Sequence, residues 1–180
     1  MKSSRGEINK KLKKILKFLI LFNLFSIPLY LFIIFSINIE PLQVLTASEV
    51  NNVLHIAGVP SQLTGTEITV PMQELTFTGS IDWDCTGWKS ILAFMALIFA
   101  TDASLGKKLR GLVFIPVIYC INIFRVSVVF LYVSRYGLSY YEAVHSFLFG
   151  AFMIMIILSL WIVWLKYFNF PEKKIVSKKS

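Results

Sequence analysis

Charged residues are too few in this chain for a soluble domain. Only 16% of the 180 residues are charged, while 56% are hydrophobic, and the mean hydropathy is +0.70. A soluble domain of this length needs a larger polar surface to be solvated. We therefore expect an all-α polytopic membrane protein, folded as a single membrane-embedded domain over residues 1–180.

The sequence also lacks the common signatures of cofactor sites and of serine hydrolases. It shows no metal-ligand spacing, no phosphate-binding loop and no serine nucleophile motif. No cofactor is therefore implied. The chain holds only two cysteines and two histidines, which leaves few side chains for reactive chemistry.

Four apolar runs are present, and they predict four transmembrane helices. A helix needs about 20 apolar residues to cross the hydrocarbon core. The second run is short, so its start near Cys85 is expected close to the membrane surface. The first run is too long for a signal peptide and is interpreted as an uncleaved anchor. The runs are Ile15–Ile37, Gly87–Thr101, Leu112–Val133 and Ser146–Tyr167.

Basic residues predict the topology. Fifteen of the 18 Lys and Arg residues lie in the tail through Lys17, in the loop at 107–110, or from Lys166 onward. These segments share one side if four spans alternate, and Lys and Arg concentrate on the cytoplasmic side. We expect basic cytoplasmic tails at 1–14 and 168–180 and an extracytoplasmic segment at 38–83. Contact with anionic lipid explains these charges better than contact with nucleic acid.

The predicted extracytoplasmic segment should contain one short helix. The stretch "TASEVNNVLHIAGVP" begins with a capping-box pattern, Thr46 to Glu49. Val50, Val53 and Leu54 follow at helical spacing. This pattern predicts a helix at the membrane surface, beginning at Thr46.

A β-ribbon should follow that helix. Thr66–Val70 and Leu75–Ile81 are rich in strand-forming residues and predict two paired strands. Pro71 confines the first of them to an edge, because proline has no N–H for the ladder. An exposed edge beside a nucleophile would hold an extended peptide; a simple lid is the alternative.

The stretch "WDCTGWKS" places Cys85 at the border of the second apolar run. Thr86-Gly87 indicates a helix start, which lowers the pKa of a nearby thiol. Lys89, four residues further on, should act in the same direction. Asp84 opposes these effects or orients a neighbouring group. We predict a free, thiolate-prone Cys85 facing the outer compartment.

Cys120 is not expected to pair with Cys85. It lies about 20 Å from the outer end of its span, at 1.5 Å per residue. A disulfide needs Cα atoms within about 7 Å. Cys120 also points away from Asn122 and Arg125, and we interpret it as a small buried hydrophobic residue.

Arg125 is the costly charge in the third run. A guanidinium within the bilayer costs from about 2.5 to more than 10 kcal/mol. Helical spacing puts Asn122, Arg125, Val129, Tyr132 and Tyr136 on one face, which should point into the protein. Arg125 either pairs structurally or awaits negative charge that develops in a reaction. His145 opens the fourth run, level with Cys85.

Three short motifs together resemble the archaeosortase/exosortase family. They are "DCTG" at Asp84–Gly87, "NIFR" at Asn122–Arg125 and "HSFLFG" at His145–Gly150. The resemblance covers about residues 45–155 and implies a cell-membrane cysteine protease and transpeptidase that sorts proteins to the cell surface.

The resemblance also implies residue roles and partners. Cys85 would attack the substrate carbonyl and form a thioester, Arg125 would stabilise the oxyanion, and His145 would exchange protons. Asn122, Asp84, Lys89 and Tyr132 are supporting candidates. The partner would be a membrane-anchored secreted protein with a C-terminal sorting signal, and a lipid or other amine would accept the acyl group.

Two other classes of function remain open. One is a non-catalytic membrane assembly or binding subunit, in which Arg125 and Asp84 pair structurally. The other is a different thiol enzyme, such as an acyl carrier or an oxidoreductase. A redox role would require a second cysteine within reach, and Cys120 is predicted too far away.

Overall fold

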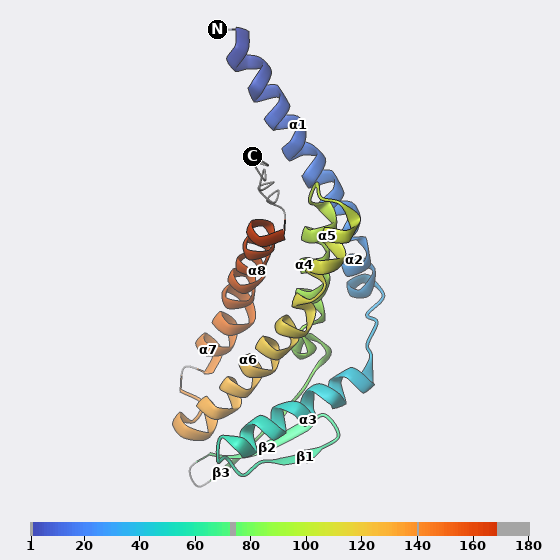
Figure 1. Ribbon diagram of the computed structural model, residues 1–180. Helices are drawn as coiled ribbons and strands as arrows, with labels where there is room; N and C mark the ends of the chain where they lie inside the picture. Colours follow the sequence, from blue (N-terminus) through green and yellow to red (C-terminus); the bar gives the residue numbers. More distant parts are fainter. Residues whose placement is uncertain (1, 73–74, 140, 169–180) are drawn as a thin grey trace, which may run out of the picture.

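The computed structural model describes residues 2–72, 75–139 and 141–168, which form helices and one small sheet (Figure 1). The elements are α1 (Lys2–Phe25), α2 (Ile27–Ile34), α3 (Glu40–Ile56), β1 (Gln62–Thr64), β2 (Glu67–Met72), β3 (Leu75–Ser80), the 3₁₀ turn η1 (Trp83–Thr86), α4 (Trp88–Ala100), α5 (Leu105–Gly111), α6 (Phe114–Tyr136), α7 (Tyr141–Phe147), the π-helical turn η2 (Leu148–Phe152) and α8 (Met153–Phe168).

Within the described residues, three helical segments are long and apolar enough to cross a membrane. They are Gly6–Ile34, Leu105–Tyr136 and Tyr141–Tyr167, so the first, third and fourth predicted runs are confirmed as candidate spans. The second run forms α4, which has 13 residues and a length of about 20 Å. It is apolar but shorter than a full span.

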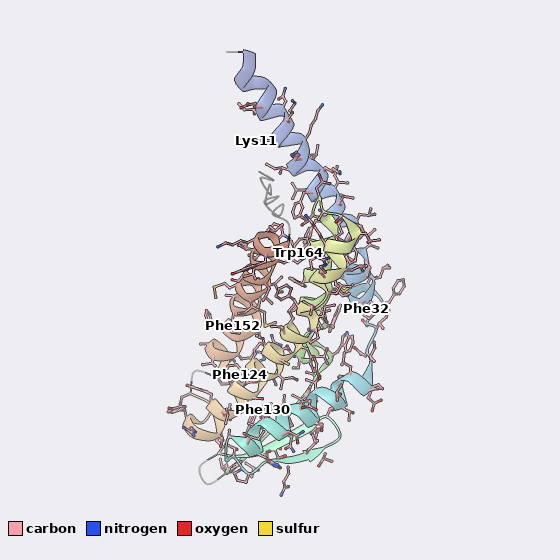
Figure 2. All side chains as sticks on the ribbon, in the orientation of Figure 1. Lys11, Phe32, Phe124, Phe130, Phe152 and Trp164 are labelled. Carbon is pink, nitrogen blue, oxygen red and sulfur yellow. The ribbon has the colours of Figure 1, made fainter. Side chains whose placement is uncertain are left out.

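The predicted basic tails have different outcomes. Residues 2–14 are helical and continue into the first span as one helix, α1. Figure 2 shows Lys11 on a part of α1 that projects away from the rest of the molecule. Of the predicted tail at 168–180, only Phe168 is described; residues 169–180 lie outside the described residues.

The apolar helices pack around buried aromatic and aliphatic side chains. Phe94 of α4, Ile118 of α6 and Trp164 of α8 are fully buried in one cluster. Gly111 allows this packing, since a Cβ there would lie 2.6 Å from the Ile98 side chain and 2.8 Å from Trp164 Nε1. The cluster joins α4, α6 and α8 into one bundle.

A second core surrounds the C-terminal half of α6. Val126 and Phe130 of α6 pack with Val50 and Leu54 of α3 and with Ile68 of β2. Helix α3 and the sheet therefore form a layer at one end of the molecule, and the C-terminal half of α6 packs against it (Figure 1). The part of α6 around Arg125, which includes Ile123 and Val126, packs against this layer.

The predicted start of α3 was wrong. The helix begins at Glu40, with Pro41 in its first turn, a position where the missing N–H of proline costs nothing. Thr46 lies inside the helix, and its hydroxyl donates a hydrogen bond of 2.8 Å to the Leu42 carbonyl. The capping-box pattern was a coincidence of spacing.

The β-ribbon is confirmed, but the predicted edge is wrong. β2 and β3 are antiparallel, and the extra strand β1 pairs with the other side of β2, which makes β2 central. β1 reaches only Glu67–Thr69, while Pro71 lies opposite Thr76 of β3. Pro71 is thus tolerated because β1 ends before it.

Candidate active site

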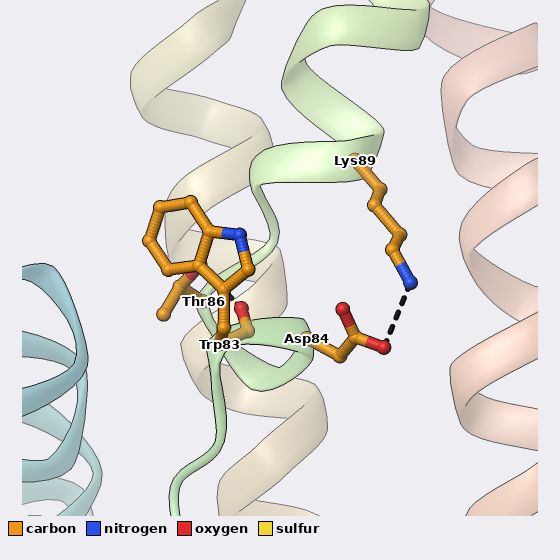
Figure 3. A network of polar contacts seen from close by, with 4 residues as sticks. All are labelled: Trp83, Asp84, Thr86 and Lys89. Atoms are coloured by element: carbon orange, nitrogen blue, oxygen red, sulfur yellow. Dashed lines mark hydrogen bonds and ion pairs between the residues drawn. The ribbon is translucent and has the colours of Figure 1, made fainter. Parts of the chain in front are cut away.

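Cys85 lies in the 3₁₀ turn that precedes α4. Its backbone N–H donates a hydrogen bond of 2.9 Å to the Asp82 carbonyl. The Thr86 hydroxyl donates to the Trp83 carbonyl at 2.8 Å, which closes the turn (Figure 3). Gly87 then adopts a left-handed φ of +79° before α4 begins at Trp88. Cys85 is therefore held by a tight turn rather than at the first turn of α4.

Asn122 fixes this turn against α6. Its Nδ2 donates a hydrogen bond of 2.8 Å to the Cys85 carbonyl. A Cβ at position 87 would lie 2.7 Å from the Asn122 side-chain carbon. Glycine is thus required at 87 both for the positive φ and for the close approach of Asn122. Asn122 therefore holds the turn that carries Cys85 against α6.

A cavity of about 290 Å³ opens beside Cys85. Cys85 and Asp82 line it from the turn, Tyr141 and His145 from α7, and Phe130 from α6. The rings of Tyr141 and His145 stack with centroids 5.5 Å apart. The structure therefore brings Cys85 and His145, which are 60 residues apart in sequence, to the same cavity.

Arg125 belongs to the same group of residues. Its side chain is buried, with 4% of the residue exposed, and it follows Asn122 by three positions, on the same face of α6. Its positive charge acts on both Cys85 and His145. Asn122, Arg125 and Val129 are buried, as the helical spacing predicted, but Tyr136 of the same predicted face is 63% exposed.

The thiol of Cys85 is not thiolate-prone at rest. Burial raises its pKa above the ordinary value, and the nearby carboxylates of Asp82 and Asp84 act in the same direction. The hydrogen bond involving the Asp82 backbone and the charge of Arg125 oppose burial and lower the pKa. The predicted lowering was wrong because desolvation of a thiolate outweighs both effects.

Lys89 does not act on Cys85 as predicted. Its Nζ donates to the Asp84 carboxylate at 2.7 Å, and both side chains are about half exposed. Figure 3 shows this pair on the flank of the turn. Both residues line a different cavity together with Trp83 and Trp88. Asp84 and Lys89 therefore position each other beside the turn.

Tyr132 lies outside the cavity that Cys85 lines. Its hydroxyl donates a hydrogen bond to the Ser139 carbonyl near the end of α6. It lines a separate hollow with Arg135 and Tyr136. About three turns of α6 separate Tyr132 from Asn122. Tyr132 shares a helix face with Asn122, but this distance along the helix axis keeps Tyr132 away from the cavity of Cys85.

Cys120 is exposed on α6, so the prediction of a buried residue was wrong. Its direction, opposite to Asn122, agrees with the helical spacing, but that side of α6 has no neighbouring helix to cover it in the described parts of the chain. Cys120 is not among the residues that line the cavity of Cys85.

Two further titratable residues, Tyr141 and Asp82, line the cavity without having been selected from the sequence. Tyr141 lies one helical turn before His145, so helical spacing from His145 would have found it. Asp82 lies three residues before Cys85, at the start of the turn, where its carbonyl accepts the Cys85 N–H. Among the residues that the structure describes, no cluster of three His, Cys, Asp or Glu residues is arranged to hold a metal ion.

The fold and the cavity define a class of protein first. It is a multi-pass, mostly helical membrane protein in which a thiol, a guanidinium and an imidazole from three separate elements lie close together beside a small antiparallel sheet.

Comparison with known proteins then gives the family. A sequence model described as Transmembrane exosortase (Exosortase_EpsH) matches residues 9–164. The chain belongs to this exosortase family, a group of protein-processing membrane enzymes.

One curated relative matches a shorter stretch. Archaeosortase A of Haloferax volcanii is 40% identical over 68 residues. The match covers 37% of this chain and 22% of that protein. The match thus spans about a fifth of the length of the curated relative. No solved structure matches the chain.

Proposed function

We propose that this chain is a membrane cysteine peptidase and transpeptidase that cleaves the C-terminal sorting signals of secreted proteins. The observation that carries the proposal is the cavity shared by Cys85 and His145 and reached by the charge of Arg125. Membership in the exosortase family supports the same class of reaction.

The proposed chemistry begins with a neutral thiol. Because burial raises the pKa of Cys85, its proton must leave as the sulfur attacks, and His145 is the proposed acceptor. A C–S bond forms at the substrate carbonyl, and Arg125 stabilises the negative charge that develops on the oxygen. The C–N bond then breaks, His145 returns the proton to the leaving amine, and a thioester remains on Cys85.

The second half of the reaction reverses these steps with a new nucleophile. An amine, or water, gives its proton to His145 and attacks the thioester carbonyl. The C–S bond breaks and Cys85 regains a proton. A membrane lipid that carries an amine is a suitable acceptor because it reaches the site by diffusion within the same membrane.

The proposed topology has four crossings, with both termini in the cytoplasm and Cys85 outside. α4 is the short crossing. It packs between α1, α6 and α8, and it begins near Asn122, the ninth of the 23 residues of α6. The layer of α3 and the sheet around the outer half of α6 would then lie outside the bilayer, with Cys85 at its base.

This topology explains why a thiol lies at the membrane border. A substrate held by its own C-terminal helix would present its cleavage motif near that depth. Anchoring both partners in one membrane raises their effective concentration and limits their relative orientations. We expect the scissile bond and Cys85 to meet without a large soluble binding domain.

The two alternatives have less support. A non-catalytic assembly subunit in which Asp84 pairs with Arg125 is disfavoured, because Asp84 is bound by Lys89. A thiol oxidoreductase would need a second cysteine at the site, and Cys120 is not among the residues that line the cavity.

The proposal predicts different outcomes for the two cysteines. Cys85→Ala should abolish processing, and Cys85→Ser should lose most of it, since a hydroxyl is ionised far less than a thiol at neutral pH. Cys120→Ala should process normally. A gel shift of an epitope-tagged secreted protein that ends in a sorting signal, coexpressed with each variant, measures this. Activity that survives in Cys85→Ala would refute the assignment.

A further inference from the structure

One wall of the cavity is a continuous stretch of the chain. Phe77, Thr78, Gly79, Ser80, Ile81 and Asp82 all line it. Side chains of a strand alternate between its two faces, so a cavity on one face would meet every second residue. Six consecutive residues indicate instead that the cavity runs along the outer edge of β3 and continues to Cys85.

The direction of the backbone groups on this edge follows from one hydrogen bond. The Ile81 N–H donates to the Thr66 carbonyl at 2.9 Å, toward β2. Successive N–H groups of a strand point to opposite sides. Phe77 and Gly79 therefore direct their N–H and C=O groups toward β2, and Thr78 and Ser80 direct theirs away from it.

That outer side of β3 carries no further strand in the described parts of the chain. The sheet itself is fixed, because Ile68 and Val70 of β2 are fully buried in the core around α6. A fixed sheet with an open edge matches a binding surface better than a movable lid.

The floor beside this edge is apolar and shaped by a glycine. Phe77 and Phe130 meet edge to face with ring centroids 6.0 Å apart. A Cβ at Gly79 would lie 3.0 Å from the Phe130 ring. Gly79 thus lets the strand lie close to α6, and the aromatic floor is suited to small or apolar side chains of a ligand.

We propose that an extended peptide binds along the outer edge of β3 as an added strand, hydrogen-bonded to the backbone groups of Thr78 and Ser80. The occupant is the cleavage-motif segment of the secreted substrate, so the inference rests on the proposed function. The edge leads directly through Asp82 to the turn that holds Cys85, which would align the peptide carbonyl with the thiol. Backbone pairing of this kind supplies affinity, and the aromatic floor supplies selectivity.

The test compares two electrophiles that carry the same reactive group. Chloroacetone and acetyl-Ala-Ala-Ala chloromethyl ketone both alkylate a thiol with loss of chloride, but only the second has peptide groups. In the Cys120→Ala protein, where Cys85 is the only thiol, the ratio of the two rates measures recognition of the peptide. We expect the peptide reagent to react at least about tenfold faster, a preference that a few backbone hydrogen bonds supply.

Thr78→Pro should reduce that ratio by roughly fivefold to tenfold, because it removes one outward N–H donor. Proline is tolerated there because the N–H does not serve the β2 ladder. Thr76→Pro changes the same edge outside the cavity, and Thr78→Val removes only the hydroxyl that contacts Thr69. Both controls should keep the ratio, and an N-methylated peptide reagent should lose its advantage.

Two results would overturn the inference. One is an equal rate ratio in Thr78→Pro and Thr76→Pro, and the other is the absence of any peptide preference in the parent protein. A dimer that blocks peptide labelling and dissociates in Thr78→Pro would assign the edge to a second copy instead. Labelling of Cys85 does not require catalytic turnover. The labelling ratio therefore tests peptide binding, while processing by the Cys85 variants tests the proposed function separately.

Discussion

At the scale of single residues, the reactivity of Cys85 depends on opposing effects of burial and of neighbouring charges on its pKa. Burial raises its pKa, whereas the Arg125 guanidinium lowers it and the Asp84 carboxylate raises it. A raised pKa keeps the thiol neutral at pH values where an exposed cysteine begins to ionise. Alkylation of Cys85 should therefore increase with pH through a midpoint above that of an ordinary thiol.

Changing the two charges should move that midpoint in opposite directions. Asp84→Asn removes a negative charge that disfavours the thiolate, so the midpoint should fall. Arg125→Gln removes a positive charge that favours the thiolate, so the midpoint should rise. Rates of iodoacetamide modification against pH, measured in the Cys120→Ala background, test both variants. Because Asp84 is exposed, its variant will fold, and an unchanged or raised midpoint there would contradict this view of the charges.

The candidate residues themselves could be selected from the sequence, but their environments could not. Cys85, Asn122, Arg125 and His145 stood out by residue type and spacing, and all four meet at or beside the cavity. The pKa direction of Cys85 and the role of Lys89 were wrong. Both depend on burial and on which neighbour a side chain contacts, and spacing along the chain does not specify either.

At the scale of elements, the junction between η1 and α4 positions the thiol. The left-handed Gly87 lets the chain turn from the 3₁₀ turn into the helix, while Asn122 of α6 binds the Cys85 carbonyl. This junction connects the bundle of α4, α6 and α8 to the layer of α3 and the sheet. A change here should affect both stability and the position of the thiol.

Gly87→Ala should destabilise the protein by at least about 1 kcal/mol. Alanine in the left-handed region costs roughly 1–2 kcal/mol, and its Cβ would also contact Asn122 at 2.7 Å. Gly106→Ala is the matched control, because it lies in α5 and an added Cβ would meet no atom within 4 Å. A lower melting temperature in detergent for Gly87→Ala alone is expected; equal melting temperatures would show that the junction is not strained.

Element prediction from sequence succeeded where one physical signal dominates. The long apolar runs gave three candidate spans, and alternation of strand-forming residues gave the β2–β3 ribbon. The start of α3 and the strand β1 were missed. α3 begins at Glu40 with Pro41 in its first turn, a start signal that the capping-box pattern at Thr46 obscured. β1 has only three residues, which is too short for a periodic pattern.

At the scale of the whole molecule, the two cores divide the chain into an apolar helix bundle and the layer formed by α3 and the sheet. The bundle leaves many large apolar side chains of α1, α2 and α8 exposed, as expected for lipid contact. α6 passes from the bundle into the layer, and Cys85 lies where the two meet. Hydropathy alone could not reveal this, because α6 is apolar in both parts.

The division of the molecule relates topology to chemistry. If the layer is extracytoplasmic, a reagent outside the cell should reach Cys85. If Cys85 is the nucleophile, modifying that thiol should stop processing. The two statements are tested together when Cys85 is the only cysteine.

The most direct measurement treats intact cells that express the Cys120→Ala protein with a membrane-impermeant maleimide, then washes them and induces an epitope-tagged secreted substrate. Intact mass gives the modified fraction of Cys85, and a gel shift gives processing, with Cys85→Ala cells as the inactive reference. We expect Cys85 to be modified in intact cells and processing to fall in proportion to the modified fraction. Undiminished processing by a fully modified protein, or modification of Cys85 only after the cells are permeabilised, would contradict an outward-facing catalytic thiol.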